Sequence, residues 1–243
     1  MNTKNKSFIN IKPGMSSSVS CIALIFFILI VTTNFGHVAR AQQQSSEPRP
    51  DALEAEQRLS ELGYWTGPVD GIFDVGSRHA LIAFQKVELR SRTGKLTPDE
   101  LEAIRAAKRP VALETRSPHV EVDLSRQVLF IVDSSGQVSK ILPVSSGSGK
   151  PFTSEGWTRR AVTPTGRFTV SHKIAGWRKS PLGLLYYPVY ILNGIAIHGN
   201  PLVPVYPASH GCIRIPMFAA KEFSEMMPVG TTVIVHDGNA IEP

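Results

Sequence analysis

The residues most able to do chemistry in this sequence lie between positions 197 and 214. Two segments, Ile197-His198-Gly199-Asn200 and Ser209-His210-Gly211-Cys212-Ile213-Arg214, place two imidazoles near a thiol along the chain. A cysteine attacks as its thiolate, and an unperturbed thiol of pKa ~8.5 is only slightly ionised at neutral pH. An imidazole within hydrogen-bond reach takes up that proton or holds an ion pair. The pattern is therefore typical of a nucleophilic cysteine with a histidine base.

His198 is the stronger candidate for that base. It ends an apolar run that starts at Ile195, and Gly199 follows it at a point where the chain can turn. A base at the end of a rigid strand can be held facing a nucleophile on a loop. His210 has the poorer geometric claim, because it lies two residues before Cys212 and a tight turn would redirect both side chains.

The neighbours of the cysteine suit an acyl-transfer site. Gly211 permits close approach of the backbone, so the amides of residues 210–212 are placed to face one developing oxyanion. Arg214 is placed to hold a carboxylate through a charge-assisted pair. Less specific interpretations stay open: a histidine at a strand end is usually structural, a lone arginine is usually solvated, and Cys212 could be a buried, inert thiol.

A zinc site is the competing interpretation of the same side chains. His198, His210 and Cys212 are ligand types that zinc accepts, but their spacing matches no common zinc pattern and no second cysteine is near. A papain-like arrangement is also excluded, because there the cysteine comes well before its histidine. Acyl transfer at Cys212 is the favoured interpretation.

The first 41 residues are typical of a secretory signal. They contain four cationic side chains and no acidic one, and their apolar run, Cys21–Val31, has 11 residues. That is too short to span a bilayer as a helix, which needs ~20 residues. Ala39-Arg40-Ala41 supplies a small-residue cleavage site, so we expect cleavage after Ala41. An uncleaved amino-terminal anchor is the alternative.

Removal of this signal changes both the net charge and the cysteine count. The whole chain has 26 basic and 20 acidic side chains; without the four cations of residues 1–41 it has 22 against 20, a net charge of +2. A nucleic-acid partner therefore loses its main electrostatic support. Cys212 is then the only cysteine, so no internal disulfide can form, and a lone thiol in an exported protein is a candidate reactive group.

The remaining chain is predicted to contain a linker and two domains. Residues 42–50 are polar, with two prolines, and predict a flexible linker. Residues 51–109 predict three short helices, a bundle of a size that is marginal but viable alone. Capping-box spacing at Asp51 starts the first helix, and Thr97-Pro98 starts the third.

Residues 117–238 predict strands and one helix. Val128–Val132 is a continuous apolar run, and Asp133–Gly136 joins it to a second run as a hairpin turn. A helix is expected at Pro216–Met226. The side chains expected to face inward from that helix are Phe218, Ala219, Phe223 and Met226. The predicted fold class is α+β, a small three-helix domain followed by a mostly β domain.

Two further segments invite a functional interpretation and do not support it well. Gly147–Lys150 resembles a phosphate-binding loop but lacks its first glycine and its final Ser or Thr, so a hairpin turn is the better prediction. Arg159 and Arg160, near Trp157, form either a basic lip over an anionic substrate or a solvated surface pair. The solvated pair is the more common case.

The motifs described above resemble those of L,D-transpeptidase catalytic domains of the YkuD type. His198-Gly199 followed by Ser209-His210-Gly211-Cys212-Ile213-Arg214 is similar to the family signature, and Thr163–Phe168 is similar to its upstream strand entry. The resemblance covers about residues 117–238 and implies a β-sandwich-like fold. Two departures are a short interval between His198 and Cys212, and Arg214 at a position where some members have Asn.

This resemblance implies a set of roles. Cys212 would be the nucleophile and His198 the base, with the backbone carbonyl of Gly199 orienting the imidazole. Ser209, His210 and Gly211 would shape the site and the oxyanion hole. The implied reaction forms 3→3 crosslinks between peptidoglycan stem peptides through a thioester and needs no cofactor. A carboxypeptidase or other hydrolase of the same fold, and a non-enzymatic wall-binding protein, are the alternatives.

Residues 51–109 are similar to a peptidoglycan-binding three-helix domain. The matching segments are Leu62–Trp65, Gly67–Asp74 and Ala83–Gln85, whereas the usual third segment is degenerate at Thr93–Leu96. The two resemblances together imply an exported protein of the periplasm or cell wall. Its implied partners are peptidoglycan stem peptides, and its implied covalent inhibitors are β-lactams of the carbapenem class.

Overall fold

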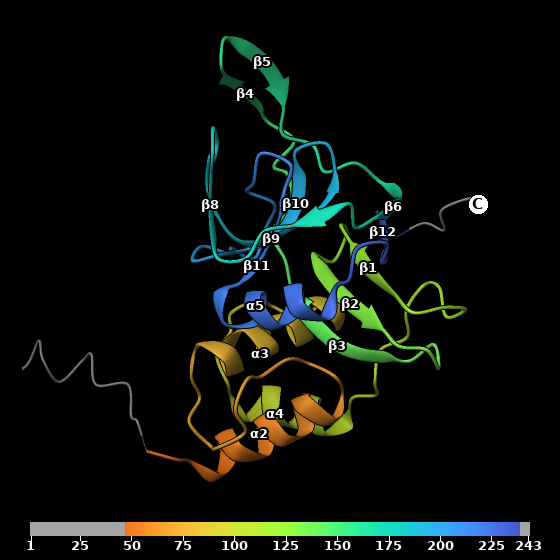
Figure 1. Ribbon diagram of the computed structural model, residues 1–243. Coiled ribbons are helices and arrows are strands. Elements are labelled where there is room, and N and C mark those ends of the chain that lie inside the picture. Colours follow the sequence, from red (N-terminus) through yellow and green to blue (C-terminus); the bar gives the residue numbers. More distant parts are fainter. Residues whose placement is uncertain (1–46, 239–243) are drawn as a thin grey trace, which may run out of the picture. The chain divides into compact units, whose positions relative to one another are not determined.

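The computed structural model describes residues 47–238 (Figure 1). The predicted export signal, residues 1–41, and most of the predicted linker, residues 42–50, lie outside the described residues. Within residues 47–238, no helix has both the length and the apolar character needed to cross a bilayer.

Three helices form the amino-terminal part, as the sequence predicts: α2 (Pro50–Glu61), α3 (Val75–Val87) and α4 (Pro98–Ala106). The hydroxyl of Thr97 accepts a hydrogen bond from the N–H of Glu100 and so caps α4. The predicted capping box at Asp51 is wrong. Helix α2 has no side-chain cap and begins at Pro50, so Asp51 lies inside its first turn.

The predicted mostly β domain, residues 117–238, consists mainly of two sheets and one helix, which confirms the predicted architecture. The first sheet has the strand order β3-β2-β1-β12-β6, and the second has the order β11-β10-β9-β7 with β8 paired to β9. Helix α5 (Met217–Met226) follows β11 directly. The strands of the first sheet are β1 (His119–Asp123), β2 (Val128–Val132), β3 (Val138–Pro143), β6 (Gly166–Thr169) and β12 (Thr232–His236). Those of the second are β7 (His172–Lys173), β8 (Trp177–Ser180), β9 (Gly183–Leu192), β10 (Ile195–Asn200) and β11 (Ile213–Pro216).

The first sheet is covered on both of its faces. Leu129 and Ile131 of β2 join a core with the second sheet and α5. Val128, Phe130 and Val132 of the same strand join a second core with the three helices. Since successive side chains of a strand point to opposite faces, this double cover explains the unbroken apolar run of β2.

The helical part also extends the edge of the first sheet. The N–H of Trp65 donates to the carbonyl of Ile141 at 3.0 Å, and the N–H of Ile141 donates to the carbonyl of Gly63 at 2.8 Å. These bonds satisfy backbone groups at the edge strand β3, which would otherwise be open to pairing with another chain. The helices and the first sheet thus share one core and one continuous hydrogen-bonded edge.

A buried lysine lies at the junction of the helices and strands. Lys86 of α3 is fully buried, and its ammonium donates to the carbonyls of Gln127 at 2.9 Å and Val144 at 2.8 Å. Burial lowers the pKa of Lys86 to about 7, and the charge of Arg92 adds to that effect. This lysine therefore ties α3 to the open end of the β2–β3 hairpin, where β2 begins and β3 ends, without an acidic partner among the described residues.

Two predictions about strand connections have different outcomes. The hairpin turn at Asp133–Gly136 is confirmed, because it joins the antiparallel strands β2 and β3. The predicted turn at Gly147–Lys150 is wrong: that segment leads into β4 (Pro151–Ser154), which pairs with β5 (Trp157–Arg160). The turn of this second hairpin is Glu155-Gly156.

Helix α5 lies where it was predicted, but two of its side chains face the other way. Ala219 and Phe223 are fully buried, as expected. Phe218 and Met226 are 37% and 39% exposed, which contradicts the prediction. The buried stripe continues through Ala220 and the C-cap residue Met227 instead, because α5 and its cap present positions 219, 220, 223 and 227 to the sheets.

Candidate active site

The register of two parallel strands brings the predicted catalytic residues to one face of the second sheet. In the β10–β11 pair, Ile197 lies opposite Ile213 and His198 lies opposite Arg214. Both isoleucines belong to the core. Since side chains alternate along a strand, His198 and Arg214 point to the other face, and Cys212 precedes β11 with the same parity as Arg214. The pairing of His198 with Cys212 as base and nucleophile stays a prediction.

The imidazole of His198 is held by the backbone that follows it. The side chain is 4% exposed, and Nδ1 lies 2.9 Å from the carbonyl oxygen of Gly199. Burial lowers the pKa of His198 to about 4; the bond to Gly199 opposes this shift, and the charge of Arg214 adds to it. The ring is therefore neutral at pH 7, and because a carbonyl only accepts, the proton lies on Nδ1. Nε2 is left as a proton acceptor.

The close fit at Gly199 explains why a glycine follows the histidine. A Cβ atom at this position would lie 2.6 Å from the Cβ of Ala220 and 3.0 Å from the ring of Tyr186. Any larger residue would push β10 away from α5 and move the carbonyl that orients the imidazole.

The thiol of Cys212 lies beside the start of β10 and is half-buried. It donates to the carbonyl of Gly194 at 3.6 Å. Burial raises the pKa of the Cys212 thiol above its usual value, although the N–H of Ala196 and the charge of Arg214 partly oppose that shift. A protonated thiol and a neutral imidazole favour proton transfer to His198 during attack over an ion pair formed in advance.

The protonation state of His198 gives the first testable prediction. We expect its imidazole to stay neutral down to about pH 4, because burial disfavours the charged ring. The measurement is an NMR titration of the His198 ring signals, assigned by comparison with His198→Gln. A midpoint between pH 6 and 7, the range of a solvated histidine, would contradict the buried neutral base.

Hydrogen bonds from Ser209 close the loop around the cysteine. Its hydroxyl donates to the carbonyl of Cys212 and accepts from the N–H of Gly211 at 3.0 Å. The N–H of Gly211 was predicted to face an oxyanion together with its neighbours, and it points into the loop instead. Gly211 has φ +132°, and a Cβ atom there would lie 3.0 Å from the carbonyl oxygen of Val162, so the position requires glycine.

Thr163 is a site residue whose part the sequence pattern alone did not reveal. Its hydroxyl donates to the carbonyl of Gly211 at 2.7 Å and accepts from the N–H of Gly147 at 2.8 Å. The carbonyl of Ser146 accepts the N–H groups of Ala208 and Ser209, both at 2.9 Å. These contacts brace the loop from the side of the first sheet. Only the resemblance of Thr163–Phe168 to a family motif pointed to this segment.

Arg214 and His210 take different positions around the thiol. The guanidinium of Arg214 is half-buried, and its charge lowers the pKa of both the thiol and the imidazole. No ion pair is found for it among the described residues, so it is available to a carboxylate. His210 is exposed, and its ring lies 4.8 Å from the ring of Phe152, on the side of the β4–β5 hairpin.

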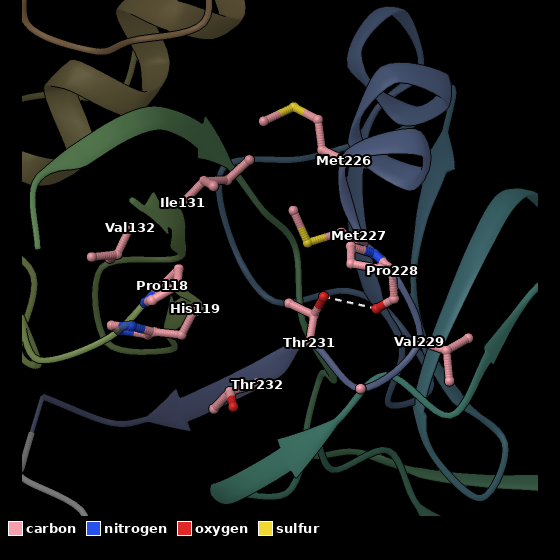
Figure 2. Close-up of a pocket in the computed structure, with 11 residues that line it drawn as sticks. Pro118, His119, Ile131, Val132, Met226, Met227, Pro228, Val229, Thr231 and Thr232 are labelled. Atoms are coloured by element: carbon pink, nitrogen blue, oxygen red, sulfur yellow. Dashed lines mark hydrogen bonds between the residues drawn. The ribbon is translucent and has the colours of Figure 1, made fainter. Parts of the chain in front are cut away.

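The structure gives no support to a zinc site. Within the described range, no group of three or more His, Cys, Asp or Glu side chains is placed to hold a metal ion. A cavity of about 500 Å³ lies between the first sheet and the end of α5. Its lining, which includes Ile131, Met227 and Thr231, is drawn in Figure 2. This cavity contains none of the predicted site residues.

Comparisons with known proteins identify the family and the fold of the chain. The family model of the L,D-transpeptidase catalytic domain (YkuD) matches residues 117–235, and the putative peptidoglycan binding domain matches residues 48–104. No curated protein matches the chain. An L,D-transpeptidase crystal structure (residues 123–326) from Xylanimonas cellulosilytica DSM 15894 is 36% identical, with a TM-score of 0.74 over 79% of this chain and 96% of that chain.

Two more distant structures bear the same family name. An L,D-transpeptidase from Stackebrandtia nassauensis is 20% identical, with a TM-score of 0.45 over 79% of this chain and 95% of that one. An L,D-transpeptidase solved in complex with imipenem is also 20% identical, with a TM-score of 0.41 over 49% of this chain and 59% of that one. From the family match and the 36% identity to the Xylanimonas structure, the chain belongs to the L,D-transpeptidase family and has a helical domain of the peptidoglycan-binding type before its catalytic domain.

Proposed function

We propose that this protein is a cysteine-dependent L,D-transpeptidase that forms 3→3 crosslinks in peptidoglycan. The main support is the register of β10 and β11, in which His198 lies opposite Arg214, two residues after Cys212, together with the bond that orients the His198 imidazole on the carbonyl of Gly199. Residues 1–41 would direct export of the protein to the periplasm or cell wall. Residues 51–109 would bind peptidoglycan, and residues 117–238 would catalyse the reaction.

The first half-reaction is acylation of the cysteine. Nε2 of His198 takes the thiol proton while Sγ of Cys212 attacks the carbonyl between stem residue three and the terminal D-alanine. The tetrahedral adduct collapses, the bond to the D-alanine nitrogen breaks, and the imidazolium returns the proton to that nitrogen. D-alanine leaves and a thioester remains on Cys212.

The second half-reaction transfers the acyl group. A side-chain amine of a neighbouring stem attacks the thioester, His198 takes a proton from the amine, and the thiolate leaves and regains a proton. Attack by water in place of the amine would give a tripeptide, which is the hydrolase alternative. No cofactor is needed, because the thioester conserves the energy of the original peptide bond.

Arg214 would link substrate binding to the strength of the base. Its charge lowers the pKa of His198, so the unoccupied site has a weak base. A substrate carboxylate paired with Arg214 would offset that charge and raise the proton affinity of the imidazole when it is needed.

The product assay tests this proposal directly. Purified protein is incubated with disaccharide-tetrapeptide muropeptides, and products are identified by mass. We expect crosslinked dimers and released D-alanine, both lost in Cys212→Ser, together with a carbapenem adduct on Cys212. Tripeptide alone would indicate the hydrolase. No product dependent on Cys212 and no adduct would refute the enzymatic proposal.

A further inference from the structure

The β4–β5 hairpin stands clear of the two larger sheets (Figure 1). Its two-residue turn, Glu155-Gly156, has φ values of 52° and 80°. Positive φ at both central residues is the geometry that matches the twist of a tight hairpin. The short turn fixes the register, in which Phe152 lies opposite Arg159 and Ser154 lies opposite Trp157.

Both legs of the hairpin are bonded to the loop that holds the nucleophile. On one leg, the N–H of Ser148 donates to the carbonyl of Ser209 at 2.9 Å. On the other, Thr163 donates to the carbonyl of Gly211. The legs are also bonded to each other, through the N–H of Gly149 and the carbonyl of Ala161 at 2.9 Å. The position of the hairpin is therefore fixed relative to Cys212.

The register separates the two arginines of β5. Directly opposed residues share a face, so Arg159 lies on the face of Phe152, and Arg160 lies on the other face with Pro151. The ring of Phe152 contacts the ring of His210 at 4.8 Å, which turns its face toward the catalytic loop. Trp157 lies on that same face and is 69% exposed.

The face toward the site combines positive charge with an open aromatic ring. Of the three basic side chains in residues 150–160, the register places Arg159 on this face, beside the exposed ring of Trp157. No ion pair engages Arg159 within the part of the chain that the structure describes. A guanidinium binds carboxylates in a bidentate way, and an exposed indole offers a flat apolar surface with a polar edge.

We propose that the β4–β5 hairpin is a recognition arm for the anionic stem peptide and its attached sugar, with Arg159 binding a stem carboxylate and Trp157 packing on the sugar. This inference rests on the proposed function and names how its substrate is held. Arg160 has no part in it, because it faces away from the site. Stem peptides are rich in free carboxylates, so their charge complements that of the arm.

The test uses matched charge removals on the two faces of one strand. Affinity for a disaccharide-tetrapeptide is measured by calorimetry with the Cys212→Ala protein alone and combined with Arg159→Gln, Trp157→Ala or Arg160→Gln. We expect the dissociation constant to rise about 3- to 30-fold for Arg159→Gln and Trp157→Ala, and less than about 2-fold for Arg160→Gln. In proteins that retain Cys212, KM should rise for the first two variants while kcat changes little.

The outcomes separate this inference from the proposed function. The recognition arm would be overturned if Arg159→Gln and Arg160→Gln changed the dissociation constant equally, or if neither changed it. This holds even when muropeptide turnover and carbapenem acylation are normal. A differential effect on binding would support the arm even if the wild-type protein made no crosslinked product, in which case only the proposed reaction fails.

Discussion

Replacing His198 by glutamine is expected to slow acylation of Cys212 by about 10²- to 10⁴-fold, the usual contribution of a positioned general base. The thiol pKa is raised by burial, so few molecules hold a thiolate at neutral pH without help. Glutamine keeps a polar side chain of similar length but accepts no proton. The measurement is the rate of adduct formation with a carbapenem, followed by intact mass.

The matched control for this variant is His210→Gln. His210 is closer to Cys212 in sequence than His198 is, but it is exposed and its ring lies against the ring of Phe152, so the His210→Gln change should slow acylation less than about tenfold. Raising the pH should also bring the rate of His198→Gln toward that of the wild type, because hydroxide then removes the thiol proton. Equal losses in the two variants, or no recovery at high pH, would argue against His198 as the base.

Replacing Glu121 by glutamine is expected to lower the free energy of unfolding by about 3 kcal/mol. This fully buried carboxylate of β1 accepts the N–H groups of Leu113 and Glu114, and Nε2 of His119 and of His236 lie 3.6 and 3.3 Å from it. Burial alone would raise its pKa, but these partners outweigh burial and lower the pKa from 4.5 to about 2.

The pH dependence follows from the sign of that shift. Because the folded pKa lies below the unfolded one, the stabilisation is complete above pH 4.5 and is lost as the pH falls toward 2. The midpoint temperature of thermal unfolding at pH 7 should be about 6–12 °C lower in Glu121→Gln than in the wild type. This difference in midpoint temperature should shrink at pH 2–3. Glu54→Gln removes an exposed carboxylate that pairs with Arg105, and it should leave the unfolding temperature nearly unchanged. A difference for Glu121→Gln that does not depend on pH would refute this role.

The sequence predicts most of the secondary structure, because this depends on local patterns, and it also names candidate site residues. The apolar run Val128–Val132 and the Asp133–Gly136 turn specify a hairpin by themselves. The pairing of His198 with Cys212 rests on the need of an ordinary thiol for a base, and the register of β10 and β11 adds that His198 lies opposite Arg214, two residues after the thiol.

What the sequence does not predict depends on contacts between distant segments. Phe218 and Met226 fit a helical apolar stripe as well as their neighbours do, and only the position of the sheets decides which side of α5 is buried. The amide of Gly211 is directed by the hydroxyl of Ser209, and no spacing rule reveals that bond. The β4–β5 hairpin has exposed side chains on both strands, so it lacks the apolar alternation by which strands are recognised.

The shared core between the helices and the first sheet has a mechanical consequence. A module on a flexible tether samples many distances from its catalytic partner, whereas α3 is fixed to the strands by Lys86 and by the edge bonds at Ile141. If the helices bind a glycan strand, the distance from the bound sugar to the sulfur of Cys212 is constant. Crosslinks would then form at one preferred spacing along the wall.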